Sequence, residues 1–192
     1  MTIRRLPVFL VATALLVAGC GNKNDEKSAA APTTAPTAAA ATPTAATTPE
    51  PAAAPVSLKT LKPVENATDL DKEPIVPQQP GTAPAQLISK DLVKGTGPAA
   101  KSGDTLSVQY TGYSLSDGQK FDASWNRGAQ PFDFQLGAQQ VIAGWDQGIV
   151  GMKVGGRREL VIPSDLGYGP AGNPPIAPNE TLIFVVDLVK IK

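Results

Sequence analysis

Residues 84–192 predict an α+β domain in which one short helix crosses a mostly antiparallel sheet. Two observations lead to this fold class. Several short runs alternate apolar and polar residues, as half-buried strands do, and turn residues separate them. One segment between these runs instead carries apolar residues four positions apart, which is the spacing of a helix face. A stretch of this length is sufficient for one hydrophobic core.

The predicted strands begin near residue 86 and are rich in β-branched and aromatic residues. The clearest alternation places Leu106, Val108 and Tyr110 on one face, with polar residues between them. The pair Asp117-Gly118 tolerates a left-handed backbone, so we expect a hairpin turn there. The expected strands cover residues 105–115, 120–122, 132–136, 157–162 and 181–191.

The helix is predicted from Val141, Trp145 and Ile149, which fall on one helical face and are followed by glycine at 151 and at 155–156. The segment Val141-Ile142-Ala143-Gly144-Trp145 also suits the floor of an apolar pocket, because tryptophan offers a large rigid face and glycine permits close approach. Taken alone, however, this segment favours an ordinary core position for Trp145.

The composition before this domain is different. Residues 28–55 hold 13 Ala, 7 Thr and 6 Pro, and they contain no aromatic or large aliphatic residue. Such a stretch cannot build a core, and its prolines disfavour the alternative of a packed Ala-rich helix. A few apolar residues return after Val56, but without a regular period. We therefore predict a disordered Ala/Pro/Thr-rich linker over residues 20–83.

The N-terminus has the pattern of an export signal: a basic pair, Arg4-Arg5, is followed by an apolar run too short to span a bilayer. The run ends in Val17-Ala18-Gly19-Cys20, which resembles the lipobox of bacterial lipoproteins. This resemblance implies a signal peptide over residues 1–19 and acylation of Cys20, with two or three acyl chains as a stable anchor. An ordinary signal peptide with an incidental cysteine is the alternative.

The expected location is therefore the bacterial cell envelope, with the domain lipid-anchored and facing the periplasm. Gly21 and Asn22 follow the cysteine in place of the aspartate that often marks inner-membrane retention in enteric bacteria. This favours the outer membrane if the source is Gram-negative.

The charged residues exclude some classes of function. Formal net charge is zero, and residues 84–192 balance ten Lys/Arg against ten Asp/Glu, so no basic stripe indicates nucleic-acid binding. The chain has no histidine and one cysteine, which removes the commonest general base and leaves almost nothing for a zinc site. We expect no metal and no cofactor.

Eight motifs, in order along residues 86–191, resemble the FKBP-type peptidyl-prolyl cis-trans isomerases over the full length of their domain. In that family a twisted antiparallel sheet wraps around one short helix, and the pocket lies between them. The motifs are Val108-Gln109-Tyr110-Thr111-Gly112, residues 117–122 (DGQKFD), residues 132–137 (FDFQLG), residues 141–145 (VIAGW), residues 148–156 (GIVGMKVGG), Ile162-Pro163, residues 166–169 (LGYG) and residues 181–184 (TLIF).

The resemblance implies a set of site residues. Trp145 would lie under the substrate proline ring, and the backbone N–H of Ile142 and the hydroxyl of Tyr168 would donate to substrate carbonyls. Asp122 would interact with the rotating carbonyl or organise the site, with a surface turn aspartate as the alternative. The remaining substrate-binding residues would be Tyr110, Phe121, Arg127, Phe132, Val141, Ile176 and Phe184, whereas Phe134 is assigned mainly to the core.

The implied activity is isomerisation of X–Pro bonds in exported proteins, without a nucleophile or cofactor. A non-catalytic binding or scaffolding module is the alternative. Partners would be proline-containing polypeptides, the membrane through Cys20, and macrolide ligands, whose affinity is left open by changes at the pocket rim such as Asn173 and Ala177. Dimeric surface members of the family use a helical N-terminal segment, which the proline-broken linker cannot supply, so we expect a monomer.

Overall fold

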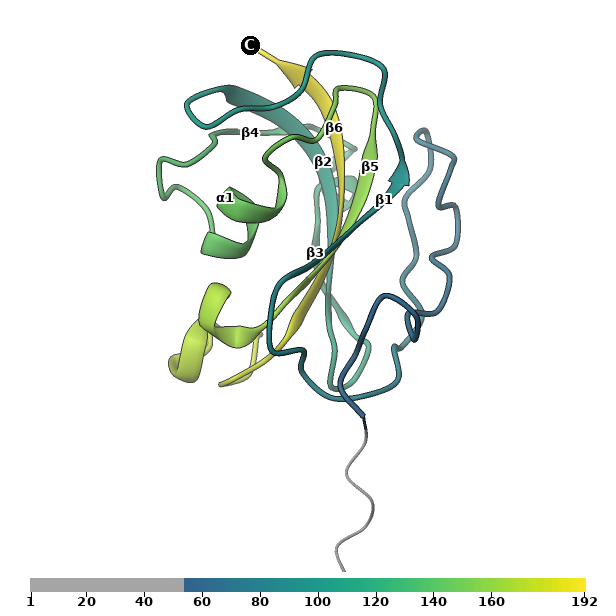
Figure 1. Cartoon of the computed structure of the whole chain (residues 1–192), viewed down its shortest axis with the longest axis vertical. Helices are drawn as coiled ribbons and strands as arrows, with labels where there is room; N and C mark the ends of the chain where they lie inside the picture. The colour runs from purple at the N-terminus through teal and green to yellow at the C-terminus, as the bar shows by residue number, and fades with distance from the viewer. Residues whose placement is uncertain (1–53) are drawn as a thin grey trace, which may run out of the picture. The chain divides into compact units, whose positions relative to one another are not determined.

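The computed structural model describes residues 54–192, which form one six-stranded sheet with a short helix on one face (Figure 1). The path through the sheet runs β1-β5-β6-β2-β3, all antiparallel, and β4 pairs with β2 outside this path. The strands are β1 Ile88–Val93, β2 Thr105–Ser114, β3 Lys120–Ala123, β4 Phe132–Gln135, β5 Arg157–Ile162 and β6 Leu182–Ile191. The α-helix is α1 Ala143–Gly148, and the short 3-10 helices are η1 Ser124–Arg127, η2 Ser164–Leu166 and η3 Gly169–Ala171.

The main hydrophobic core lies between the sheet and α1. It includes Leu106 and Val108 of β2, Trp145 of α1 and Leu160 of β5, each at most 4% exposed. The helix approaches β5 closely because Gly144 has no side chain: a Cβ there would lie 2.4 Å from Cγ2 of Ile162. This contact fixes the height of α1 above the sheet, and with it the depth of the space beside the helix.

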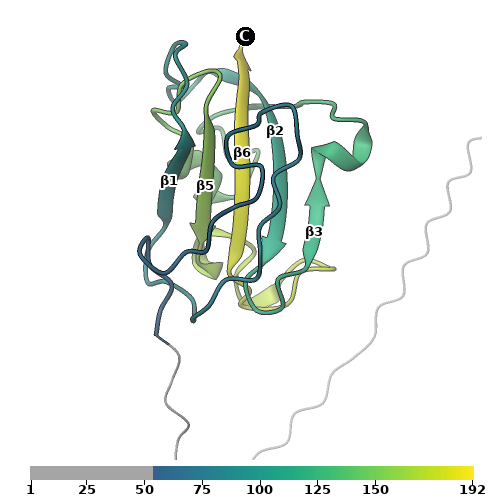
Figure 2. The same cartoon turned by 90° about the vertical axis from the view of Figure 1, so that its right-hand side faces the viewer.

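The opposite face of the sheet is covered by residues 54–83, which cross over β5, β6 and β2 (Figures 1 and 2). We call these residues the N-terminal segment. Their apolar side chains form a second core with the outward-facing side chains of the sheet. The buried members from the segment are Val56, Leu61, Val64 and Val76, and those from the domain are Tyr113, Leu115, Val161, Ile183 and Val185.

The N-terminal segment is held by a buried charged group as well as by apolar contact. The side chain of Arg157, on β5, is fully buried and forms an ion pair with Asp187 on β6. The same guanidinium donates hydrogen bonds to the backbone carbonyls of Asn66, Asp69 and Lys72. Irregular backbone over a sheet needs such partners for its carbonyl groups, and Arg157 supplies three of them.

The expectation of a disordered linker therefore does not hold for its last part, residues 54–83. The sequence pattern was aperiodic because this segment forms neither a helix nor a regular strand, with isolated bridges such as Glu65↔Ile75 in their place. Its order comes from tertiary contacts, including hydrogen bonds to residues 38 to 91 positions away, which local periodicity does not encode. The predicted boundary at residue 84 thus separates two parts that pack together.

The predicted α+β fold class is confirmed, as are the expected strands to within one or two residues at their ends. The helix prediction was partly wrong. Val141 lies before α1, because Ile142 has an extended backbone (φ −60°, ψ 148°) and serves as the N-cap, and Ile149 is the C-cap. The helix is thus shorter than the apolar spacing indicated, although Trp145 and Ile149 are buried as expected.

The predicted signal peptide, the lipidation site Cys20 and the first part of the linker lie outside the described residues. Within residues 54–192, no helix has the length and apolar character needed to cross a membrane.

Candidate active site

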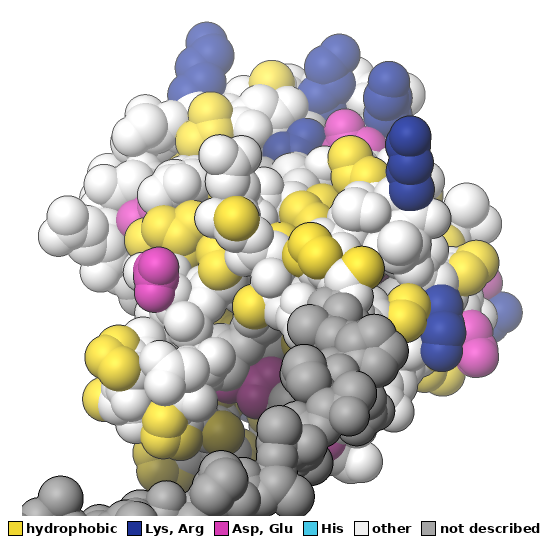
Figure 3. All heavy atoms as spheres, turned by 60° about the horizontal axis from the view of Figure 1, so that its bottom comes forward, with side chains coloured by type: hydrophobic (Ala, Val, Ile, Leu, Met, Phe, Trp, Pro, Cys, Tyr) yellow, Lys and Arg dark blue, Asp and Glu magenta, His cyan; other side chains and the backbone are white. Residues whose placement is uncertain are grey.

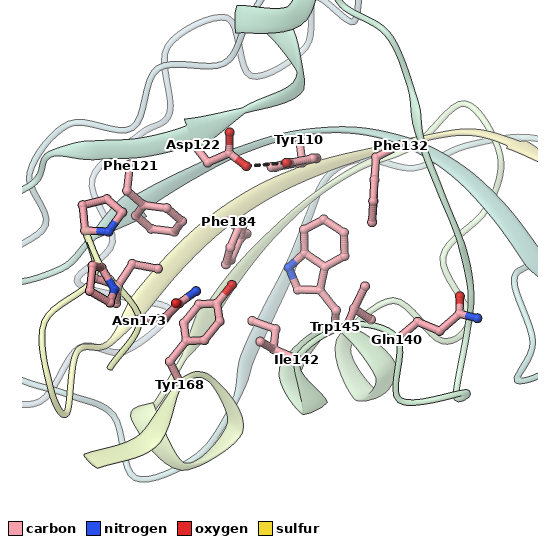
Figure 4. Close-up of a pocket in the computed structure, with 14 residues that line it drawn as sticks. Tyr110, Phe121, Asp122, Phe132, Gln140, Ile142, Trp145, Tyr168, Asn173 and Phe184 are labelled. Atoms are coloured by element: carbon pink, nitrogen blue, oxygen red, sulfur yellow. Dashed lines mark hydrogen bonds between the residues drawn. The ribbon is translucent and has the colours of Figure 1, made fainter. Parts of the chain in front are cut away.

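A cavity of about 380 Å³ opens between α1, the sheet and the loops around η2 and η3 (Figure 4). Its position follows from the fold, since α1 covers only part of the curved sheet face. The lining is predominantly aromatic and apolar. It consists of Tyr110, Phe121, Asp122, Phe132, Gln140, Val141, Ile142, Trp145, Tyr168, Asn173, Pro174, Pro175, Ile176 and Phe184.

The floor of the cavity is built from aromatic rings that meet edge to face. The indole of Trp145 lies 5.2 Å from the ring of Phe184 and 5.3 Å from that of Tyr110, with interplanar angles of 86° and 77°. Phe121 meets Phe184 at 5.5 Å and 83°. Such perpendicular pairs are favoured by the ring quadrupoles, so the floor is rigid as well as apolar.

A glycine in β2 makes room for this arrangement. A Cβ on Gly112 would lie 2.6 Å from Cζ of Phe121 and 2.7 Å from Cε1 of Phe184. Any larger residue at this position would therefore push both rings away from the sheet.

The polar side of the cavity is a three-residue network. Tyr110 donates its hydroxyl proton to Oδ2 of Asp122 at 2.5 Å, as the dashed line in Figure 4 marks. Arg127 donates to Oδ1 of Asp122 at 2.8 Å and to the Tyr110 hydroxyl oxygen at 2.6 Å. The backbone N–H of Ala123 also donates to Oδ1, at 2.8 Å. Asp122 therefore accepts three hydrogen bonds, which fix the orientation of its carboxylate.

This network sets the protonation states. Partial burial alone would raise the pKa of Asp122, but the hydrogen bonds from Tyr110 and Arg127 outweigh it and hold the pKa below its ordinary value. Burial, followed by the hydrogen bond to Asp122, raises the pKa of Tyr110. At neutral pH the carboxylate is ionised and the phenol is neutral. An ionised and fully engaged Asp122 is suited to organising the site and poorly suited to proton transfer.

Two further polar groups at the cavity have no partner among residues 54–192. The Tyr168 hydroxyl is one of them, and Figure 4 shows the side chain directed into the pocket towards Phe184. The other is the backbone N–H of Ile142, whose own carbonyl accepts the first bonds of α1 from Trp145 and Asp146. Both are donors available to a ligand carbonyl.

The structure brings the predicted site residues together. All of them line the cavity except Arg127, which lies behind Asp122 and Tyr110, and Cys20, which is outside the described residues. Phe134 is buried beneath the floor, stacked on Phe132 at 5.8 Å. Asn173, expected at the pocket rim, is part of the lining, whereas Gln140, Pro174 and Pro175 line the cavity without having been predicted. The adjacent prolines in the loop before Ile176 were the one available signal, since such a loop is stiff.

Comparison with known proteins agrees with this geometry. Residues 97–189 match the family model described as FKBP-type peptidyl-prolyl cis-trans isomerase. The chain is 61% identical over 113 residues to an FK506-binding protein of Streptomyces anulatus, covering 58% of this chain and 90% of that protein. The chain belongs to the FKBP-type peptidyl-prolyl cis-trans isomerases.

Other similar proteins and solved structures are consistent with membership of this family. A probable FK506-binding protein of Corynebacterium glutamicum is 44% identical, over 57% of this chain and 90% of its own length. Among solved structures, AtFKBP13 is similar with a TM-score of 0.53 and 36% identity, covering 57% of this chain and 95% of that one. FkpA from Escherichia coli has a TM-score of 0.51 and 44% identity, over 55% of this chain and 48% of FkpA. The protein is thus an enzyme that interconverts cis and trans prolyl bonds.

Proposed function

We propose that this isomerase binds an X–Pro segment in the aromatic cavity and acts on exported proteins as a lipid-anchored enzyme of the bacterial envelope. The observation that carries the first part is the pairing of a rigid apolar floor, around Trp145, with two donors at its edge, the Ile142 N–H and the Tyr168 hydroxyl. Neither donor has a partner within the described part of the chain, residues 54–192. The second part rests on the sequence Val17-Ala18-Gly19-Cys20.

The chemistry requires no nucleophile. Rotation about a peptide bond faces a barrier of about 18–20 kcal/mol, because resonance gives the C–N bond partial double-bond character. The planar amide has a large dipole that water stabilises, whereas the twisted amide has lost much of that charge separation. An apolar cavity that excludes water therefore raises the ground state more than the transition state, and so lowers the barrier.

The side chains divide this work between them. The faces of Trp145 and Phe184 suit a proline ring, since both are rigid and apolar. Donation from Ile142 N–H and the Tyr168 hydroxyl would hold the flanking carbonyls while one end of the amide turns. Asp122 keeps Tyr110 and Arg127 in place and presents a fixed negative charge beside the rotating group. We also propose that this chain binds macrolide ligands in the same cavity.

Intrinsic fluorescence tests the binding site, because the chain has two tryptophans. Trp145 lines the cavity, whereas Trp125 lies in η1 and does not. Adding a proline peptide or a macrolide ligand should change the emission of the Trp125→Phe variant. The Trp145→Phe variant should show no such change. Equal responses from both variants would contradict the assignment of the cavity.

The anchor is tested separately by mass spectrometry of the mature N-terminus and by membrane fractionation. We expect a diacylated or triacylated Cys20 and recovery of the protein with membranes. The Cys20→Ser variant should lose the lipid mass. A mature N-terminus that begins at any other residue, or an unmodified Cys20, would overturn the lipoprotein proposal and leave the isomerase assignment unaffected.

A further inference from the structure

The N-terminal segment contacts the part of the sheet that carries the polar side of the cavity. Residues 73–78 of the segment run beside the β2–β3 hairpin, which supplies Tyr110, Phe121 and Asp122. The segment approaches from the face opposite the cavity (Figures 1 and 2). Glu73 lies outside residues 97–189, the region that matches the family model.

The strand β3 is the part of this hairpin that most needs support. It lies at the edge of the sheet, pairs with β2 at three positions, and has a register shift between Gly112 and Tyr113. Its C-terminal end is anchored, because the hydroxyl of Ser124 accepts a hydrogen bond from the backbone N–H of Tyr110 at 2.9 Å. Its N-terminal end, at Lys120, is the end that meets the N-terminal segment. A short, bulged edge strand leaves the residues it carries poorly constrained on its own.

The contact at Lys120 is an ion pair with a second partner. The Lys120 ammonium lies 2.7 Å from Oε1 of Glu73 and 3.3 Å from Oδ1 of Asn126. Lys120 immediately precedes Phe121 and Asp122, and Asn126 immediately precedes Arg127. One side chain of the N-terminal segment is thus linked through Lys120 to both strand β3 and helix η1, which together hold the Asp122–Arg127 pair.

The hairpin turn is held by the same stretch of the segment. Nε2 of Gln78 donates to the carbonyl of Ser116 at 3.4 Å, and a Cβ on Gly118 would lie 2.8 Å from Cβ of Gln78. Tyr113 of β2 and Val76 of the segment are both buried in the second core. The segment therefore contacts the start of β3 through Glu73 and the turn through Gln78, and Val76 shares the second core with Tyr113 of β2.

We propose that Glu73 is a positioning residue for the isomerase site: through Lys120 it clamps strand β3 and sets the placement of Phe121 and Asp122. This inference rests on the assignment of the cavity given above. Pocket residues have to be held to about 0.5 Å for catalysis, so loosening the strand that carries them lowers the rate without unfolding the domain.

The test compares Glu73→Gln with Lys72→Gln in a chain beginning at Gly21. Lys72 forms an exposed ion pair with Asp69 in the same segment, 2.9 Å apart, and is a matched control. Two quantities are measured: kcat/KM on a proline peptide, and amide hydrogen exchange across the sheet. We expect Glu73→Gln to lower kcat/KM about three- to tenfold. We also expect faster exchange in residues 120–123 with β5 and β6 unchanged. Lys72→Gln should change neither.

Two further variants make the outcome decisive. The charge-swapped pair Glu73→Lys with Lys120→Glu restores the attraction and should recover most of kcat/KM and the exchange protection of β3. A Glu73→Gln variant with unchanged kcat/KM and unchanged exchange in β3 would overturn the proposed role of Glu73. So would a charge-swapped chain whose kcat/KM is no higher than that of the single variants. Asp122→Ala in the same assay tests the assignment of the cavity. If only the role of Glu73 is wrong, Asp122→Ala still lowers kcat/KM; if the cavity is misassigned, Asp122→Ala retains full activity.

Discussion

Arg157 and Asp187 form a two-point ion pair in the interior, with Nε–Oδ1 and Nη2–Oδ2 distances of 2.5 and 2.6 Å. The pair joins β5 to β6, and the remaining donors of Arg157 hold the N-terminal segment on the outer face of the sheet. The side chains of Arg157 and Asp187 are 0% and 8% exposed, so water is a poor substitute for either partner. One guanidinium thus joins two strands and the N-terminal segment, in addition to the apolar contacts of the second core.

Replacement of Arg157 by methionine should therefore destabilise the domain strongly. Removing one member of a buried pair typically costs about 3–5 kcal/mol, because the other charge is left buried and uncompensated. Urea denaturation followed by circular dichroism measures the change in the free energy of unfolding. The double variant Arg157→Met with Asp187→Leu should regain part of the loss, but less than all of it, since the three carbonyls stay unpaired. A single variant as stable as the wild type would contradict the anchoring role.

Removal of residues 54–83 should also destabilise the protein. The truncated chain, residues 84–192, would expose the apolar face formed by Tyr113, Val161, Ile183 and Val185. Contiguous exposed apolar surface of this kind promotes association. We expect a lower urea midpoint and concentration-dependent light scattering for residues 84–192, compared with residues 54–192. Equal stability and solubility of the two chains would show that the segment is dispensable.

Strand β2 and most of the cavity residues could be predicted from the sequence. The alternation in residues 105–115 predicted strand β2, and the family motifs brought Tyr110, Asp122, Trp145 and Tyr168 to one cavity. Such features are local in sequence or shared with relatives.

The N-terminal segment could not be predicted in this way. Its buried residues, such as Val56 and Val76, follow no period, because each is matched to a feature of the sheet face and not to a neighbour in the chain. Likewise, Arg157 stands among charged residues in the sequence, and nothing local indicates that its side chain is fully buried. Both depend on a tertiary contact between residues far apart in the chain.

Glu159 should make stability depend on pH. It is fully buried on β5, on the same face as Arg157 and Val161, and its carboxylate has no hydrogen-bond partner within residues 54–192. Lys90, opposite on β1, lies 4.0 Å away. Burial raises the pKa of Glu159, and the charge of Lys90 offsets this in part. The folded protein thus retains the proton at pH values where the unfolded chain has lost it.

The direction in which Glu159 makes stability depend on pH follows from the linkage between proton binding and folding. Where the native state binds more protons than the unfolded state, the free energy of unfolding falls as pH rises. This fall begins above pH 4.5, the ordinary value for glutamate, and ends at the raised pKa. Glu159→Gln should abolish this part of the pH dependence and stabilise the protein at neutral pH relative to the wild type. Urea midpoints between pH 4 and pH 8 measure it, and identical profiles for the two chains would contradict the prediction.

Asp122 should show the opposite behaviour. Hydrogen bonds outweigh burial and lower the pKa of Asp122 in the folded protein. Its network therefore stabilises the fold fully at pH values above 3.8, the ordinary pKa, and this stabilisation is lost as pH falls through the pKa of the folded state. Activity that depends on the ionised carboxylate should be constant through neutral pH. A pH–rate profile with an inflection between about pH 6 and pH 8 that disappears in Asp122→Asn would contradict this. Such a profile would indicate proton transfer by Asp122.

The most direct test of the account is a protease-coupled isomerase assay on a proline tetrapeptide, using the chain beginning at Gly21. We expect the wild type to accelerate cis-to-trans conversion, and Trp145→Ala and Asp122→Ala each to lower kcat/KM by about tenfold or more, since each removes part of the cavity. Circular dichroism should show that both variants retain the fold. Full activity in folded Trp145→Ala and Asp122→Ala variants would contradict the claim that this cavity is where the prolyl bond turns.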